Sequence, residues 1–206
     1  MDRADAKGTV QETEAHEIKQ KIIEAAGRLY EKKGLYETSV AEIAEAAGIS
    51  APVTYHYVNR KSDIMLLIME DFTDRIKARV VEEVTHLARP SEKLARTMQL
   101  YFRLFDKEMV KLILVYRESR TLDKSGRKRI MVAETEHVKI LEAIIQEGID
   151  AGEFKPLENV NMVAYNILMA GHTWALKNWH FKQNTTLDEY TRMQTKFYLD
   201  ALITRP

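Results

Sequence analysis

The chain has 206 residues, of which 45% are hydrophobic and 30% are charged, so it is long enough for one or two small domains with a packed core. Its 31 Lys and Arg residues balance 31 Asp and Glu residues, which argues against nucleic-acid binding by bulk charge alone. The absence of Cys excludes disulfides, thiolate catalysis and cysteine metal sites, and it fits a reducing cytoplasm.

The first part of the chain predicts a polar arm and then a helix. Residues 1–14 are polar without a period, so we expect a flexible arm. Residues 16–33 carry apolar side chains three and four positions apart, which predicts an amphipathic helix. Lys32, Lys33 and Gly34 then predict the helix end, because cations favour the negative end of the helix dipole and glycine commonly terminates helices.

Residues 38–61 predict two short helices joined by a tight turn. Ser39 and Glu42 have the S-x-x-E spacing of a capping box at the start of the first helix. Gly48 supplies the turn, because glycine adopts a left-handed conformation at no steric cost. Ser50 caps the second helix, and Pro52 lies in its first turn, where no helical N–H bond is lost. This layout is typical of a helix-turn-helix, whose second helix enters the major groove of DNA.

The remaining residues predict a helical domain that covers residues 63–206, after a helix-turn-helix domain of residues 15–62. A long helix is expected at residues 62–87, before the break at Pro90. No alternating strand pattern is present, so we predict an all-α fold of about nine helices. The later helices are expected at residues 91–105, 108–120, 126–151, 158–180 and 187–203.

Several side chains of the helix-turn-helix suit DNA. Hydroxyl groups at helix N-termini, from Ser50 and from Thr38 or Ser39, suit phosphates. Tyr55 and Tyr57 could each reach a phosphate or a thymine methyl group, although Tyr57 could instead pack against the long helix that follows.

The same segment resembles the DNA-binding signature of TetR-family transcriptional regulators. The residues that match this signature are Thr38, Ile43, Ala44, Ala47, Gly48, Ile49, Ser50, Tyr55, Tyr57, Val58, Lys61 and Ile64. The chain departs from most members at residues 52–54, where Pro-Val-Thr replaces Gly-Thr-Leu, and this leaves the bases that are read open. The resemblance implies base readers at Ala51, Pro52, Val53 and Tyr55, and backbone contacts from Thr38, Ser39, Ser50, Tyr57 and Lys61.

The resemblance implies a homodimeric repressor that binds a palindromic operator and is released by a ligand. Because the second helix carries no Arg, Gln or Asn, we expect modest direct base readout, through thymine methyl groups and DNA shape. Three alternatives remain: an activator of the same fold, a helical ligand-binding protein without operator binding, and a three-helix segment that is only a structural core.

The C-terminal half offers candidates for an effector site and for a dimer interface. A small apolar effector or an acyl-coenzyme A thioester would suit apolar segments that also carry arginines, unless those arginines are surface charges or ion pairs. The effector candidates are Phe102, Arg103, Tyr116, Arg117, Arg120, His172 and Trp174. A stripe of Met and aromatic residues suits a dimer interface or a core, and the interface candidates are Met162, Tyr165, Met169, Trp179, Phe197 and Tyr198.

No pattern indicates catalysis or a bound cofactor. The six His residues are scattered without metal-ligand spacing, and no nucleophile is paired with a base, so we expect no metal site and no enzyme activity. No apolar run approaches the roughly 20 residues of a membrane span.

Overall fold

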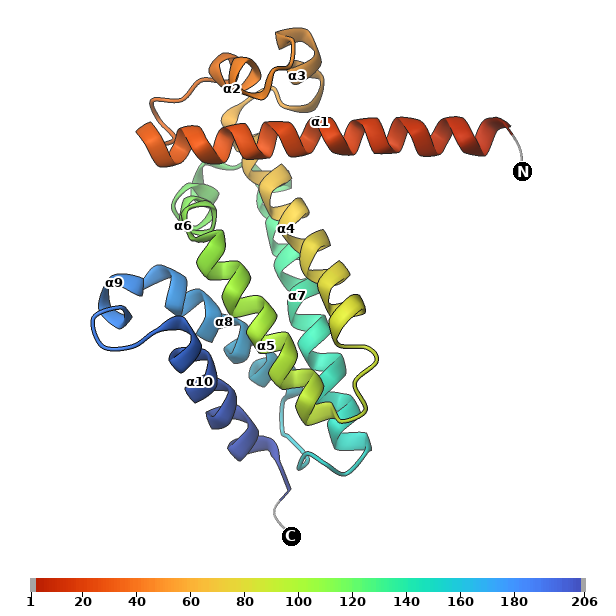
Figure 1. The fold of residues 1–206 in the computed structure, drawn as a ribbon, viewed down its shortest axis with the longest axis vertical. Helices are drawn as coiled ribbons and strands as arrows, with labels where there is room; N and C mark the ends of the chain where they lie inside the picture. The colour runs from red at the N-terminus through yellow and green to blue at the C-terminus, as the bar shows by residue number, and fades with distance from the viewer. Residues whose placement is uncertain (1–2, 205–206) are drawn as a thin grey trace. The chain divides into compact units, whose positions relative to one another are not determined.

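The computed structural model describes residues 3–204, except for the side chains of residues 3–12 and 121. Within these residues the chain forms ten α-helices, one short 3-10 helix and no β-strand, which confirms the all-α prediction (Figure 1). The helices are α1 (Arg3–Lys33), α2 (Val40–Ala47), α3 (Ala51–Tyr57), α4 (Lys61–Glu83), α5 (Pro90–Lys107), α6 (Met109–Glu118), η1 (Ser119–Thr121), α7 (Lys124–Asp150), α8 (Val160–Leu176), α9 (Asn178–Phe181) and α10 (Leu187–Leu202).

Three boundaries differ from those expected. Helix α1 begins at Arg3, so residues 3–14 are helical where we expected an arm, and residues 1–2 lie outside the described part. The helix expected at residues 158–180 ends at Leu176, and α9 is a separate short helix, which raises the count from nine to ten. Helix α7 already begins at Lys124, before the expected break at Gly126, because Asp123 accepts the Gly126 N–H at 2.8 Å and caps the first turn.

The chain packs into two compact units. Unit 1 comprises residues 1–71 and 114–129, and unit 2 comprises residues 72–113 and 130–206. Helices α4, α6 and α7 therefore each contribute one part to each unit. Residues 114–129 belong to the same unit as the helix-turn-helix. Unit 1 is therefore discontinuous in sequence, whereas the sequence predicted two continuous domains.

Unit 1 is built on the apolar face of α1. Ile22 and Ala26 are fully buried, and Ile43 of α2 is fully buried in the same unit. Figure 1 shows α2 and α3 on one side of α1. Val58 and Ile64, on either side of the start of α4, are also fully buried. This core fixes α2 and leaves one face of α3 free.

Unit 2 is built around the contact of α5 with α8 and α10. Gly171 allows α8 to approach α5 closely, because a Cβ atom there would lie 2.7 Å from the rings of Phe102 and Phe105. Tyr190 of α10 donates a hydrogen bond from its hydroxyl to the Ala170 carbonyl at 2.8 Å. Trp174 is 1% exposed, and its indole N–H donates to Asp106 at 2.8 Å. None of the described helices is long and apolar enough to cross a membrane.

Candidate DNA interface

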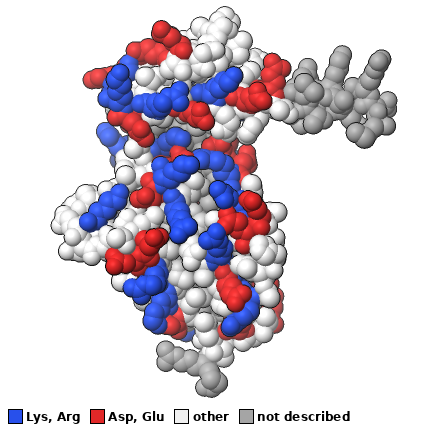
Figure 2. All heavy atoms as spheres, viewed as in Figure 1, with Lys and Arg blue, Asp and Glu red and all other residues white. Residues whose placement is uncertain are grey.

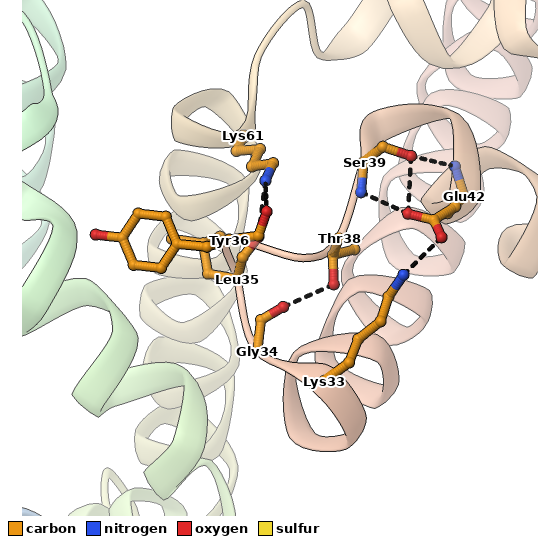
Figure 3. Close-up of polar contacts among 8 residues, drawn as sticks. All are labelled: Lys33, Gly34, Leu35, Tyr36, Thr38, Ser39, Glu42 and Lys61. Atoms are coloured by element: carbon orange, nitrogen blue, oxygen red, sulfur yellow. Dashed lines mark hydrogen bonds and ion pairs between the residues drawn. The ribbon is translucent and has the colours of Figure 1, made fainter.

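The start of α2 is fixed by a complete capping box (Figure 3). The Glu42 N–H donates to the Ser39 hydroxyl oxygen at 3.2 Å, and the Ser39 N–H donates to the Glu42 carboxylate at 2.8 Å. Lys33 of α1 adds an ion pair of 2.6 Å to the same carboxylate. The Lys33 contact, followed by the bonds from Ser39, lowers the pKa of Glu42 to about 2. The predicted capping box is confirmed, and the ion pair joins it to the end of α1.

The turn between α2 and α3 has the predicted left-handed glycine. Gly48 has a φ of 67°, and its N–H donates to the carbonyl groups of Ala44 and Glu45. Ser50 occupies the N-cap position of α3, but its side chain makes no capping hydrogen bond. The exposed Ser50 hydroxyl therefore remains available to a phosphate at the start of α3.

Helix α3 divides into a buried side and an exposed side. Thr54 is fully buried, whereas Val53 is 39% exposed and Tyr55 is 45% exposed. Ala51 and Pro52 are exposed as well. The four residues expected to read bases therefore all lie at the surface of α3. These apolar and aromatic side chains are not used by the core and are available to contact a partner.

Thr38 and Lys61 both form hydrogen bonds to backbone carbonyl groups of unit 1. Thr38 is 0% exposed, and its hydroxyl donates to the Gly34 carbonyl at 2.8 Å, so the expected phosphate contact is not supported. The Lys61 ammonium donates to the carbonyl groups of Leu35 and Tyr36 at 2.9 and 2.8 Å, as Figure 3 shows. Lys61 thereby ties the loop before α2 to the start of α4. Its remaining N–H group is the one that a phosphate could use.

Tyr57 and His56 occupy the C-terminal end of α3. Tyr57 is half-buried, which leaves both of its expected roles open, and its ring meets that of His56 edge to face at 5.2 Å. His56 is exposed beside Tyr55, although no sequence pattern indicated a role for it. Its position between Tyr55 and Tyr57, two candidate contact residues, could have indicated that His56 belongs to the same surface.

The loops on both sides of the helix pair are attached to residues 114–129 of unit 1. Tyr36, in the loop before α2, donates from its hydroxyl to the Glu118 carboxylate at 3.0 Å. Arg60, in the loop after α3, forms an ion pair of 2.6 Å with Asp123 and one of 3.3 Å with Asp63. These carboxylates raise the pKa of Arg60, chiefly through the Asp123 hydrogen bond. The segment that follows α6 is therefore part of the support of the helix-turn-helix.

The effector candidates are divided between the two units. Phe102, His172 and Trp174 are buried in unit 2, where the His172 and Phe105 rings meet edge to face at 4.4 Å. Arg103 is exposed on unit 2, whereas Tyr116, Arg117 and Arg120 are exposed on unit 1. Arg103, Arg117 and Arg120 are all exposed, which favours the alternative that they are surface charges or ion pairs.

The interface candidates are mostly exposed apolar side chains. Met162, Tyr165, Trp179 and Phe197 are between 40% and 66% exposed. Met169 and Tyr198 are half-buried, and the Tyr198 hydroxyl donates to the Asn166 carbonyl at 3.0 Å, which links α10 to α8. Unit 2 thus presents large apolar side chains on neighbouring helices, as an interface requires. Within the described residues, no group of three or more His, Cys, Asp or Glu side chains could hold a metal ion.

Two family models match most of the chain. Residues 22–67 match the model of bacterial regulatory proteins of the tetR family, and residues 87–183 match the tetracyclin repressor-like C-terminal domain. The first match spans α2 and α3, and the second spans α5 to α9. The resemblance inferred from the helix-turn-helix alone thus extends into the bundle.

Named relatives agree with these matches. The chain is 28% identical over 188 residues to the transcriptional regulator HbdR of Aromatoleum sp. (strain CIB), which covers 91% of this chain and 82% of that protein. It is 25% identical over 160 residues to the transcriptional repressor KstR2 of Mycolicibacterium smegmatis, which covers 77% of each chain. Among solved structures, FadR of Bacillus subtilis in complex with stearoyl-CoA is similar with a TM-score of 0.71 and 25% identity, over 87% of this chain and 97% of that one. The chain belongs to the TetR family of transcriptional regulators, which are DNA-binding proteins without enzyme activity.

Proposed function

We propose that this protein is a homodimeric transcriptional repressor that binds a palindromic operator through α3 and is released by a ligand. The observation that carries the proposal is the exposed face of α3. Val53 and Tyr55 are 39% and 45% exposed on a helix that is otherwise held firmly by the capping box of α2 and the turn at Gly48. A short helix held in this way can enter a major groove without rearranging its support.

The base contacts of α3 are expected to be apolar. Ala51, Pro52, Val53 and Tyr55 offer methyl, ring and phenol groups, which suit thymine methyl groups and the sugar backbone. Ser50, Ser39 and Tyr57 would position the helix on phosphates, with Lys61 adding one charge-assisted bond. A single half-site would therefore bind weakly, and two correctly spaced half-sites would be needed for tight binding.

The dimer would form through the apolar faces of α8 and α10. Met162 and Tyr165 on α8, and Phe197 on α10, are exposed in one chain and would be buried against a second copy. A two-fold symmetric pair presents the same surface twice and places two α3 helices on one face of DNA.

The effector is proposed to be an acyl thioester of coenzyme A or a small apolar molecule. Support comes from the similarity to B. subtilis FadR, whose structure holds stearoyl-CoA. Release requires that the ligand favour a conformation with wrongly placed α3 helices, because a ligand shifts an equilibrium only by its differential affinity. We place this activity in the cytoplasm, where bacterial DNA and acyl thioesters meet.

A binding experiment on the chain's own upstream DNA tests this function. Purified protein is titrated onto the promoter fragment in a mobility-shift assay, with and without palmitoyl-CoA. The proposal predicts a discrete complex that palmitoyl-CoA or an apolar effector dissociates. A complex that recruits polymerase and raises transcription in vitro would assign an activator instead. Failure to bind both this fragment and any sequence selected from a random DNA pool would overturn the proposal.

A further inference from the structure

A groove of about 570 Å³ runs between α5 and α10 in unit 2. The residues of α10 that line it fall into two rows with a spacing of four, so each row follows one side of the helix. Figure 2 shows Lys and Arg side chains interspersed with Asp and Glu over the face on which α5 and α10 lie. The groove is therefore a surface feature with charged side chains along its rim, separate from the α5 and α8 contact.

The rim row of α10 carries four charged residues, Asp188, Arg192, Lys196 and Asp200. Arg103 on α5 faces this row, so three cations and two carboxylates line the groove. Arg103 and Asp188 lie 3.6 Å apart with side chains that are 61% and 82% exposed, and Lys196 pairs with Asp200 at 2.5 Å at a similarly exposed position. Exposed pairs of this kind are weak and can exchange partners readily.

Arg192 forms neither a hydrogen bond nor an ion pair within the described part of the chain. It lies one turn from Asp188 and one turn from Lys196 in the rim row. A guanidinium group offers five N–H donors in a fork that matches phosphate geometry. The charge of Arg192 acts on Glu189, one turn away, but its N–H groups have no partner in the part of the chain that the structure describes, so Arg192 provides an anion donor at the middle of the groove.

The inner row supplies hydroxyl groups and apolar side chains. Thr191 is 6% exposed and Thr195 is half-buried, and the hydroxyl of each has no hydrogen-bond partner among the described residues. Leu199 and Ile203 continue this row. Buried hydroxyls without partners are destabilising, so their presence beside a groove points to a ligand that forms hydrogen bonds with them.

We propose that this groove binds the phosphate-bearing part of the effector, a nucleotide-sized polyanion such as the coenzyme A portion of an acyl thioester. The volume suits such a group, since ligand pockets span about 300 to 1,000 Å³. A single carboxylate would engage one of the three cations, whereas several phosphates engage Arg103, Arg192 and Lys196 together. The inference rests on the proposed function for the identity of the effector, but the groove's affinity for phosphates does not require operator binding.

The test is calorimetric titration of the full-length protein with coenzyme A, and separately with inorganic phosphate. Arg192→Gln is compared with Arg79→Gln, which removes an arginine that is 62% exposed on α4 and paired with Glu83. We expect Arg192→Gln to weaken coenzyme A binding at least tenfold, Arg192→Lys to restore part of it, and Arg79→Gln to leave it unchanged. Equal affinity of wild type and Arg192→Gln for coenzyme A would overturn the proposal, as would inorganic phosphate binding as tightly as coenzyme A.

A second readout separates the groove from the proposed function. Palmitoyl-CoA is titrated into the protein bound to operator DNA. If Arg192→Gln releases DNA at the same palmitoyl-CoA concentration as wild type, the groove assignment fails and the repressor function stands. If coenzyme A binding depends on Arg192 but no operator is bound, the groove assignment stands and the proposed function fails.

Discussion

Arg60 and Asp123 are joined by an ion pair of 2.6 Å that connects the loop after α3 to the start of α7. Asp123 also accepts the Gly126 N–H at 2.8 Å, and that bond, followed by the Arg60 contact, holds the pKa of Asp123 below its usual value. The pair makes Arg60 part of the support of the helix-turn-helix.

A double-mutant cycle tests this structural role of Arg60. We expect Arg60→Gln and Asp123→Asn each to lower the free energy of unfolding slightly, with a small but measurable coupling between them, because exposed ion pairs are weak. Urea denaturation of the four proteins measures the coupling. Additive effects would show that the pair contributes nothing. If Arg60 instead contacted phosphate, Arg60→Gln alone would reduce the salt dependence of DNA binding by about one ion.

Tyr55 is the side chain of α3 on which operator affinity should depend most. It is 45% exposed and is not needed by the core, so Tyr55→Ala should leave the melting temperature nearly unchanged. We expect operator affinity to fall by about 1 kcal/mol, roughly fivefold, the lower end of the range for a specific base contact, because an apolar contact is lost. Fluorescence anisotropy with labelled operator measures the affinity, and Tyr55→Phe separates the ring from the hydroxyl. Unchanged affinity of Tyr55→Ala would remove Tyr55 from the interface.

Phe197 should be essential for the dimer. It is 66% exposed on α10, and Val81 on α4, at 65%, is a matched exposed residue outside the proposed interface. Phe197→Asp places a charge in an apolar contact, so we expect it to yield monomers, whereas Val81→Asp remains dimeric. Native mass spectrometry reports the two states. A dimeric Phe197→Asp protein would move the interface away from this face of α10.

Two buried histidines should make unit 2 sensitive to acid. Burial lowers the pKa of His137 to about 4, with a further contribution from the Lys77 charge, and burial lowers the pKa of His172 to about 3. The unfolded chain therefore binds more protons than the folded one once the pH falls below about 6.5. The contribution of the two neutral histidines to the free energy of unfolding is fully present above that pH. It is lost as the pH falls toward their pKa values in the folded protein. His137 alone accounts for about 3 kcal/mol, an order-of-magnitude figure.

Denaturant titrations at several pH values between 7 and 4 measure this loss. We expect the free energy of unfolding to depend less on pH in the double variant His137→Asn and His172→Asn, even though that variant is less stable at pH 7. His86 is exposed, so His86→Asn provides the matched control and should retain the wild-type slope. A wild-type stability that stays constant from pH 6.5 to 4.5 would contradict the assignment of neutral buried histidines.

Local signals in the sequence were sufficient for the helix-turn-helix. The capping box of Ser39 with Glu42 and the left-handed turn at Gly48 depend on residues a few positions apart, so a pattern of a few letters predicted both correctly. The end of α1 before Gly34, with its φ of 81°, was predictable for the same reason. These local features set the boundaries of the helices around α3, so the fold of this segment could be predicted from the sequence.

The burial of individual side chains and the contacts between distant residues were not predictable in the same way. Thr38 is buried against the Gly34 carbonyl, although a hydroxyl at a helix start suggested a phosphate contact. The partner of Arg60 lies 63 positions away at Asp123, and no local pattern indicates such a pair. Arg103 follows the buried Phe102 yet is exposed, because adjacent residues on a helix face different directions. The groove between α5 and α10 likewise exists only once the two helices pack.

A dimeric repressor with weak contacts from each α3 helix requires two correctly spaced half-sites for tight binding. A DNase footprint of the wild-type protein on its upstream DNA first defines the site, and anisotropy then compares the intact site with one whose second half is scrambled. We expect a symmetric footprint with two half-sites about one helical turn or more apart, and a loss of at least a hundredfold in affinity for the scrambled site. Equal affinity for the intact and scrambled sites, or protection that Tyr55→Ala does not weaken, would contradict this expectation.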